Sequence, residues 1–496
     1  MTDKHIEVDG PLPVTAGSVP LGISDLPESG LGVDLAAHRY VEEEYLVTGG
    51  ASAWTYDDSW RAVVDVPDVA YTTRIMVRRP SNPSNFSGVV HVEPLHPSFD
   101  RGLTWRTAAP LILGEGHAWV GITQHPACAA LLRDDFSAER YGRIDIPMPG
   151  LGWDIVGGIG QLLRSPEPGN PLGDLAVRQT YLSGWSFTGT FCRMFLQEGF
   201  HQRHRQPDGR PVFDGYLIGI SSGASLRGGY HPLSEQCPLL PADHPRRTIW
   251  PADVPVIELM SEFESETNER TLRPDSDEPD DRYRLYQVAG SAHASAVELS
   301  VEEIQVAGGG NPPPRHDIRQ MPISNRNRHR VARSAYHHLH RWAAEGITPP
   351  RADRLELMPP DSEGVRGLSA EALPLRRDKH DNAVGGVRTT WADVPVASYI
   401  PHSTPGDSPD TGHGWRPPGL GREASADLTG HQIPFPPAKL ARLYGSHGEY
   451  LARVQARAGE LVRDGWLLLP DADDLIAEAA DSAHRWDGVS PAADPK

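Results

Sequence analysis

The feature that most constrains the fold is a strand, a sharp turn and a helix between residues 180 and 200. Residues 180–184 fit a short buried strand, and the chain then turns at Ser186. The apolar side chains that follow recur at close to 3.6 residues, which indicates a helix with one buried face; they are Phe187, Phe191, Met194, Phe195 and Phe200. A strand that turns sharply into a helix presents a serine at the top of a mostly parallel sheet, beside the first helical N–H groups. We therefore predict that Ser186 is a nucleophile.

The residues of this turn also allow a simpler interpretation. They are Gly184, Trp185, Ser186, Phe187, Thr188 and Gly189, so the second glycine comes one position later than in the pattern Gly-x-Ser-x-Gly. A serine between a strand and a helix can serve only as the N-cap of that helix. The order of the residues that follow Ser186 is what favours catalysis.

Strands are predicted on both sides of this turn. Alternating or continuous apolar runs occur at 44–54, 71–80, 88–97, 118–124, 212–221, 254–260 and 282–289. Helical periodicity occurs at 106–115, 153–163 and 328–345, the last with Val331, Ala335, Leu339 and Trp342 on one side. Strands that alternate with helices predict an α/β fold with a doubly wound, mostly parallel sheet.

The chain divides into three predicted parts. Residues 1–35 read as an N-terminal arm, and 36–348 as the core, with a long connection at 125–152 and an irregular insertion at 222–252 in the position of a small cap. Residues 349–496 form a C-terminal extension with late helices expected at 437–443, 448–464 and 471–485. The extension is too apolar to be disordered, so we expect it to pack on the core as part of the same unit.

An acid and a histidine follow Ser186 in the order that catalysis requires. A serine hydroxyl attacks only when a base takes its proton, and an acid must orient that base. When the serine comes first in such a sheet, the acid and then the histidine lie on loops after later strands. Glu264 follows the strand at 254–260, and His293 follows the strand at 282–289 among small residues. We predict Glu264 as the acid, with Glu262 as the runner-up, and His293 as the base.

Two N–H donors are needed to hold a tetrahedral oxyanion. One prediction is the backbone N–H of Phe187, directly after the nucleophile. The second should come from the turn after the strand at 88–97, where Pro94 and Pro97 have no N–H. His96 is the first choice there and Leu95 the second; the alternative is that His96 is an ordinary turn residue between two prolines.

Composition excludes several other classes of protein. The 496-residue chain has a net charge of −19, which disfavours nucleic acid and anionic membrane as partners. Its three cysteines form no Cys-x-x-Cys pair, and His337, His338 and His340 would point to different faces of a helix, so we predict no metal site and no cofactor. Neither a secretory h-region nor a run of 18 apolar residues is present, so we expect a cytoplasmic protein.

Several phrases of the sequence resemble one family. They are Tyr40 to Tyr45 with the following Gly49-Gly50-Ala51, Tyr71 to Pro80, Val90 to Leu95, Ala118 to Gln124, Arg140 to Gly142, Trp153 to Ile155, Asp381 to Arg388, Asp393 to Ala397 and Leu443 to Ser446. Together they are similar to the large bacterial α/β-hydrolase-domain proteins, over most of residues 36–480. The resemblance implies the α/β-hydrolase fold and a serine esterase, with the C-terminal part in the same unit, but no particular substrate.

The sequence departs from that family at three positions. Thr188 stands where the family commonly has a serine, and His96 stands where relatives tend to carry asparagine. The predicted acid is a glutamate where aspartate is commoner, so its side chain is one methylene longer.

The leading hypothesis is a serine carboxylic ester hydrolase that uses a Ser186–His293–Glu264 triad and acts on a small-molecule ester. An acyltransferase is the close alternative, because an alcohol or amine can take the acyl group in place of water. From another class, the chain could be a non-catalytic binding protein with the same fold. The sequence leaves the acyl and alcohol groups and the oligomeric state open.

Overall fold

A computed structural model gives the fold and describes residues 6–21, 33–59, 61–166, 169–173, 175–221, 245, 248–267, 272–296, 317–359, 372–407 and 421–487. Most of the insertion predicted at 222–252 lies outside these residues. Within them, the main sheet has ten strands in the order β1-β2-β3-β5-β4-β6-β7-β8-β10-β9. Their bounds are β1 (Glu7–Asp9), β2 (Tyr40–Tyr56), β3 (Ala62–Pro80), β4 (Val89–Pro94), β5 (Ala118–Ile122), β6 (Gln179–Trp185), β7 (Gly215–Gly219), β8 (Val256–Met260), β9 (Ser276–Glu278) and β10 (Asp281–Gln287).

The centre of this sheet is parallel and its edges are antiparallel. Strands β5, β4, β6, β7, β8 and β10 run in one direction. The pairs β1–β2, β2–β3, β3–β5 and β9–β10 are antiparallel. Every residue of β4, β5, β7 and β8 is buried, as expected for parallel strands covered on both faces. The doubly wound, mostly parallel sheet predicted from the sequence is confirmed.

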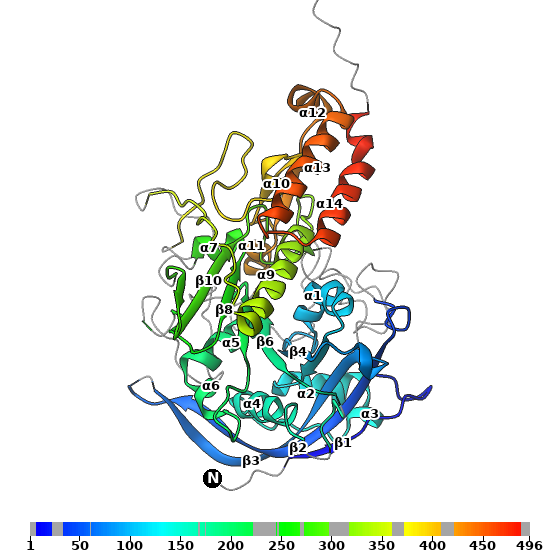
Figure 1. The fold of residues 1–496 in the computed structure, drawn as a ribbon, viewed down its shortest axis with the longest axis vertical. Coiled ribbons are helices and arrows are strands. Elements are labelled where there is room, and N and C mark those ends of the chain that lie inside the picture. The colour runs from blue at the N-terminus through cyan, green and yellow to red at the C-terminus, as the bar shows by residue number, and fades with distance from the viewer. Residues whose placement is uncertain are drawn as a thin grey trace, which may run out of the picture.

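Helices cover both faces of the sheet. Their bounds are α1 (Leu103–Gly114), α2 (Pro126–Ala130), α3 (Ala138–Tyr141), α4 (Gly152–Leu162), α5 (Phe187–Gln197), α6 (Phe200–Arg203), α7 (Glu262–Thr267), α9 (Arg326–Glu345), α10 (Thr390–Asp393), α11 (Arg422–Leu428), α12 (Pro437–Tyr444), α13 (His447–Arg463) and α14 (Leu469–Asp481). Figure 1 shows β2 and β3 as long curved strands at one end of the molecule, with α12, α13 and α14 at the other. None of the helices in the described ranges combines the length and the apolar character needed to span a membrane.

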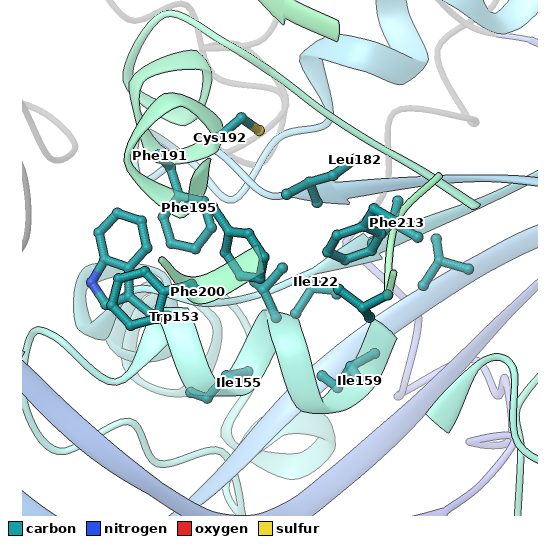
Figure 2. Packing of buried hydrophobic residues seen from close by; sticks show 14 of the residues in the cluster. Ile122, Trp153, Ile155, Ile159, Leu182, Phe191, Cys192, Phe195, Phe200 and Phe213 are labelled. Carbon is teal, nitrogen blue, oxygen red and sulfur yellow. The ribbon is translucent and has the colours of Figure 1, made fainter. Parts of the chain in front are cut away.

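One hydrophobic core lies between the sheet and the helices α4 and α5. The ring of Trp153 stacks on Phe191 with centroids 4.1 Å apart and on Phe200 with centroids 5.1 Å apart. Figure 2 shows these rings together with Phe195, above Ile155 and Ile159 of α4. Since α5 directly follows Ser186, this packing fixes the start of the helix below the predicted nucleophile. Phe187 is the exception to the predicted face, because it is only half-buried and lies outside this cluster.

A second core lies on the opposite face of the sheet. It contains Val331, Ala335, Leu339 and Trp342 of α9, which confirms the face predicted for that helix. The same cluster takes in residues of α1 and of α12, α13 and α14, so the late helices share a core with the sheet domain.

Several elements differ from the sequence expectation. The connection at 125–152 contains α2, α3 and a π-helical turn (Leu131–Phe136), because the segment buries Leu131, Leu132 and Tyr141. Part of the N-terminal arm forms β1 and pairs with β2. Within the extension, the strands β11 (Ala397–Ile400) and β12 (His431–Pro434) form a two-stranded sheet that was not predicted. Short elements such as these carry too little periodicity to be seen in the sequence.

Candidate active site

Ser186 occupies the corner between β6 and α5. Its backbone has φ 58° and ψ −119°, an unusual conformation for a residue other than glycine. The corner is held by Thr188, whose hydroxyl donates to the carbonyl of Trp185 and accepts from the N–H of Trp185, both at 3.0 Å. The N–H of Ser186 donates to the carbonyl of Gly219 at 3.0 Å. Such strain costs on the order of 1–3 kcal/mol and persists only where the surrounding structure enforces it.

Two glycines allow the chain to pack this closely. A Cβ on Gly184 would collide with the carbonyl of Thr188, and a Cβ on Gly189 would collide with the carbonyl of Gly219. The backbone of α5 therefore approaches the backbone of β7 most closely at Gly189, while Thr188 supplies the hydroxyl that stabilises the corner. This explains why the second glycine of the motif is displaced by one residue.

His293 meets Ser186 from the loop after β10. The Oγ of Ser186 lies 2.9 Å from Nε2 of His293, and Nδ1 of His293 lies 2.5 Å from Oε1 of Glu264. An ionised carboxylate has no proton to donate, so Glu264 can only accept a hydrogen bond from Nδ1 of His293. The neutral imidazole therefore carries its proton on Nδ1, and its Nε2 accepts the hydrogen bond from the serine hydroxyl. The structure thus brings together the three side chains that were predicted to act together.

Glu264 is buried and doubly anchored. Its Oε2 accepts from the N–H of Ser261 at 2.9 Å and from the hydroxyl of Ser261 at 2.5 Å. Ser261 precedes α7 and its Oγ accepts from the N–H of Phe263 at 3.2 Å, so Ser261 and Glu264 form a capping box in which the N–H of Phe263 takes the place of that of Glu264. Burial acts to raise the pKa of Glu264, but the charge of His293 and the hydrogen bonds from His293 and Ser261 outweigh it and lower the pKa.

Glu262, the runner-up acid, has a different position. Its Oε1 accepts from the N–H of Gly290 at 2.7 Å, and its Oε2 lies 2.7 Å from Nη1 of Arg377. Gly290 begins the loop that carries His293. Of the two acids, the structure therefore brings Glu264 to the imidazole and places Glu262 on the backbone of the histidine loop.

The turn after β4 corrects one prediction about the oxyanion donors. The N–H of Leu95 donates to the carbonyl of Ile122 at 2.8 Å, and the N–H of His96 donates to the carbonyl of Arg101 at 3.0 Å. Both backbone groups predicted as the second donor are thus engaged in holding the turn. The positions of the prolines show which residues of the turn have a backbone N–H. They do not show that the N–H of Leu95 pairs with β5 and that the N–H of His96 closes the turn.

A buried charge network anchors this turn. Asp100 accepts from the hydroxyl of Thr123 at 2.7 Å and forms an ion pair with Arg74 at 2.9 Å, and both of its partners are fully buried. Phe99 and Asp100 have φ of 69° and 51°, so the turn is strained and held from outside. Arg74 also pairs with Glu44 of β2 at 2.6 Å, which ties the turn to the antiparallel edge of the sheet.

The imidazoles of His96 and His125 contact the side chain of Phe187. Their ring centroids lie 6.2 Å and 5.9 Å from the Phe187 ring. Nδ1 of His96 accepts from the N–H of Ser98, and Nδ1 of His125 accepts from the N–H of Ala127, each at 3.1 Å. Each neutral ring therefore carries its proton on Nε2. His125 was not singled out in the sequence, where its place after β5 and directly before Pro126 was the available signal.

Among the described residues, no group of three or more His, Cys, Asp or Glu side chains is arranged to hold a metal ion. Cys128 and Cys192 are both free and buried.

The family model of the α/β-hydrolase domain matches residues 8–477 of this chain. The chain belongs to the α/β-hydrolase domain family. The serine corner and the histidine loop described above lie within the matched residues. No curated protein matches its sequence.

The solved structures that this chain matches share little sequence with it. A lipase/esterase from Lactobacillus plantarum is 12% identical, with a TM-score of 0.30, over 48% of this chain and 94% of its own. A fungal esterase from Rhizomucor miehei is 11% identical, with a TM-score of 0.32, over 66% of this chain and 92% of its own. A thermostable esterase from Pseudomonas putida is 12% identical, with a TM-score of 0.27, over 48% of this chain and 68% of its own.

Proposed function

We propose that this α/β hydrolase is a serine carboxylic ester hydrolase that works through an acyl-enzyme. The observation that carries the proposal is the continuous contact from Ser186 through His293 to Glu264 at the strained corner after β6. A serine that only capped α5 would not need an imidazole at 2.9 Å, and its side chain makes no capping hydrogen bond to that helix.

In the proposed mechanism, Ser186 Oγ attacks the ester carbonyl carbon while Nε2 of His293 takes its proton. The C=O electron pair moves to oxygen, and the tetrahedral oxyanion is held by hydrogen bonds. Collapse of this intermediate breaks the bond to the alkoxy oxygen, which takes the proton from His293 and leaves as the alcohol. Water, deprotonated by His293, then attacks the carbonyl carbon of the acyl-enzyme. The bond to Ser186 Oγ breaks, Oγ takes the proton back from His293, and the carboxylic acid is released. Glu264 keeps the proton on Nδ1 and stabilises the imidazolium in both halves.

A fluorophosphonate probe tests the proposal directly. We expect the folded protein to be labelled once, on the peptide that contains Ser186, and to hydrolyse members of a panel of p-nitrophenyl and alkyl esters of different acyl length. Mass spectrometry of the labelled peptide identifies the serine. Products measured with and without an added alcohol separate hydrolysis from acyl transfer. Absence of labelling in folded protein would favour the non-catalytic alternative.

For the oxyanion, we propose the N–H of Phe187 and the Nε2–H of His96 as donors. The tautomer of His96 supplies the N–H, and its ring contacts the residue that follows Ser186. We predict that His96→Ala lowers kcat by about 10²–10³, the loss typical of one oxyanion donor. His96→Asn retains a side-chain N–H and should keep kcat within about tenfold of the wild type. Steady-state kinetics on one ester measure both. Equal losses in the two variants would show that the His96 side chain does not donate.

A further inference from the structure

Helix α7 carries three buried acids within one turn and a half. Glu262, Glu264 and Glu266 are 1%, 1% and 3% exposed. Carboxylates buried this close together repel one another and lose hydration, so each needs a cation or a proton. Only Glu264 reaches His293, and the other two must be compensated by other residues.

The compensating cations come from the C-terminal extension. Arg377 lies 2.7 Å from Glu262, and His402 forms an ion pair with Glu266. The extension also binds the backbone of α7, because the N–H of Leu373 donates to the carbonyl of Glu266 at 3.1 Å. The N–H of Leu375 donates to Oε1 of Glu266 at 3.2 Å. The segment around residues 373–377 therefore lies along the helix that holds the proposed catalytic acid.

His402 is placed as a cation rather than as a neutral ring. Its Nδ1 lies 2.8 Å from the carbonyl of Asp427 and its Nε2 faces the Glu266 carboxylate, so both nitrogens donate. Burial lowers the pKa of His402, but the charge of Glu266 and the hydrogen bonds to Glu266 and to the carbonyl of Asp427 together outweigh burial and raise the pKa above its ordinary value. The ring of Phe263 lies near both imidazoles, with its centroid 5.8 Å from that of His293 and 5.6 Å from that of His402.

Other charged groups face the same region. Arg328 of α9 donates to the carbonyl of His293 at 3.1 Å. Asp381 acts on Arg377 through its charge, and Asp427 and His431 flank His402. Ser186 and Glu264 complete the surroundings of His293. Arg377 and His402 are the cations that contact the two further acids of α7.

We propose that Arg377 and His402 are positioning residues for the triad: by neutralising Glu262 and Glu266, they let α7 hold Glu264 against His293 as the one acid that acts on the imidazole. Glu262 also helps to position His293, because its carboxylate accepts a hydrogen bond from the N–H of Gly290 at the start of the histidine loop. The inference rests on the proposed function, because it assumes that His293 is the base.

A charge cycle on Glu262 and Arg377 tests the inference. The measurement is the rate of fluorophosphonate labelling as a function of pH, whose acid limb reports protonation of the catalytic base. We expect Glu262→Gln, which removes the carboxylate in contact with the permanent charge of Arg377, to move the acid limb to lower pH by about half to one unit. The double variant Glu262→Gln/Arg377→Met removes both charges and should return the limb to the wild-type pH. Arg377→Met alone should slow labelling by about tenfold or more, and Arg377→Lys should recover most of that rate.

Arg354→Met is the matched control, because Arg354 of the same extension pairs with Asp275 at 2.6 Å, outside α7. Arg354→Met should leave the acid limb of the labelling rate at the wild-type pH. If the wild type is not labelled, the proposed function and this inference fail together. If the wild type is labelled but Glu262→Gln leaves the limb unmoved, or the double variant stays shifted, the inference alone is overturned. Should the Arg377 variants not fold, Glu262→Gln alone decides the inference: its acid limb must move to lower pH while that of Arg354→Met stays in place.

Discussion

Ser186→Ala is expected to lower kcat for ester hydrolysis by about 10⁴–10⁶, with little change in KM. The variant removes the only atom that the proposed mechanism joins to the acyl group, while Phe187 and the turn after β4 still hold the substrate. A loss of this size is what removal of a serine nucleophile produces when the oxyanion donors remain. Burst kinetics and fluorophosphonate labelling should disappear together, because both require the serine oxygen.

Ser183→Ala is the matched control for this variant. Ser183 lies on the same strand, three residues earlier, and its hydroxyl is 3.0 Å from the hydroxyl of Thr104 in the buried interior. Its loss removes a hydroxyl of the same type from β6 without touching the corner, so kcat should stay within a few-fold of the wild type. Turnover by folded Ser186→Ala at more than a few per cent of the wild-type rate would show that another residue is the nucleophile.

The serine corner could be predicted because its cause is local. A short apolar run, small residues and a helical period lie within 20 consecutive positions, and each restricts the backbone independently of the rest of the chain. His293 was predictable for a related reason, since the carboxyl ends of parallel strands meet at one edge of a sheet. The position of a residue just after β10 therefore places it near residues just after β6.

The supporting residues could not be predicted from local patterns. The N–H groups of Leu95 and His96 donate to the carbonyls of Ile122 and Arg101. These partners are determined by the pairing of β4 with β5 and by the closure of the turn, which a local pattern does not show. Arg377 and His402 lie more than 100 residues after Glu262 in a segment without strong periodicity. One local signal was present and missed: Ser261 followed three residues later by Glu264 is the pattern of a capping box.

That capping box gives a reason for glutamate in place of aspartate. One carboxylate must reach back to the N–H and hydroxyl of Ser261 with Oε2 and reach His293 with Oε1. An aspartate at the same position is one methylene shorter and cannot span both partners from the third residue of α7. The glutamate in place of the commoner aspartate is thus explained by the position of the acid in the first turn of the short helix α7.

We predict that Glu264→Gln lowers kcat by about 10⁴, because an amide at this position stabilises neither the Nδ1–H tautomer nor the imidazolium. Glu264→Asp should lose less, about 10–100-fold, since it keeps the charge but cannot hold the cap and the imidazole together. Steady-state kinetics over pH 5–9 on one ester, with circular dichroism to establish folding, measure both variants.

Glu262→Gln is the control that separates the two acids. Its carbonyl oxygen can still accept from the N–H of Gly290, so kcat at the pH optimum should fall by no more than about tenfold while the acid limb shifts as argued above. The expected order of kcat is therefore Glu262→Gln above Glu264→Asp above Glu264→Gln. The reverse order for the two glutamine variants would make Glu262 the acid that acts on His293, which would require the histidine loop to move away from the position in which Nδ1 lies 2.5 Å from Glu264.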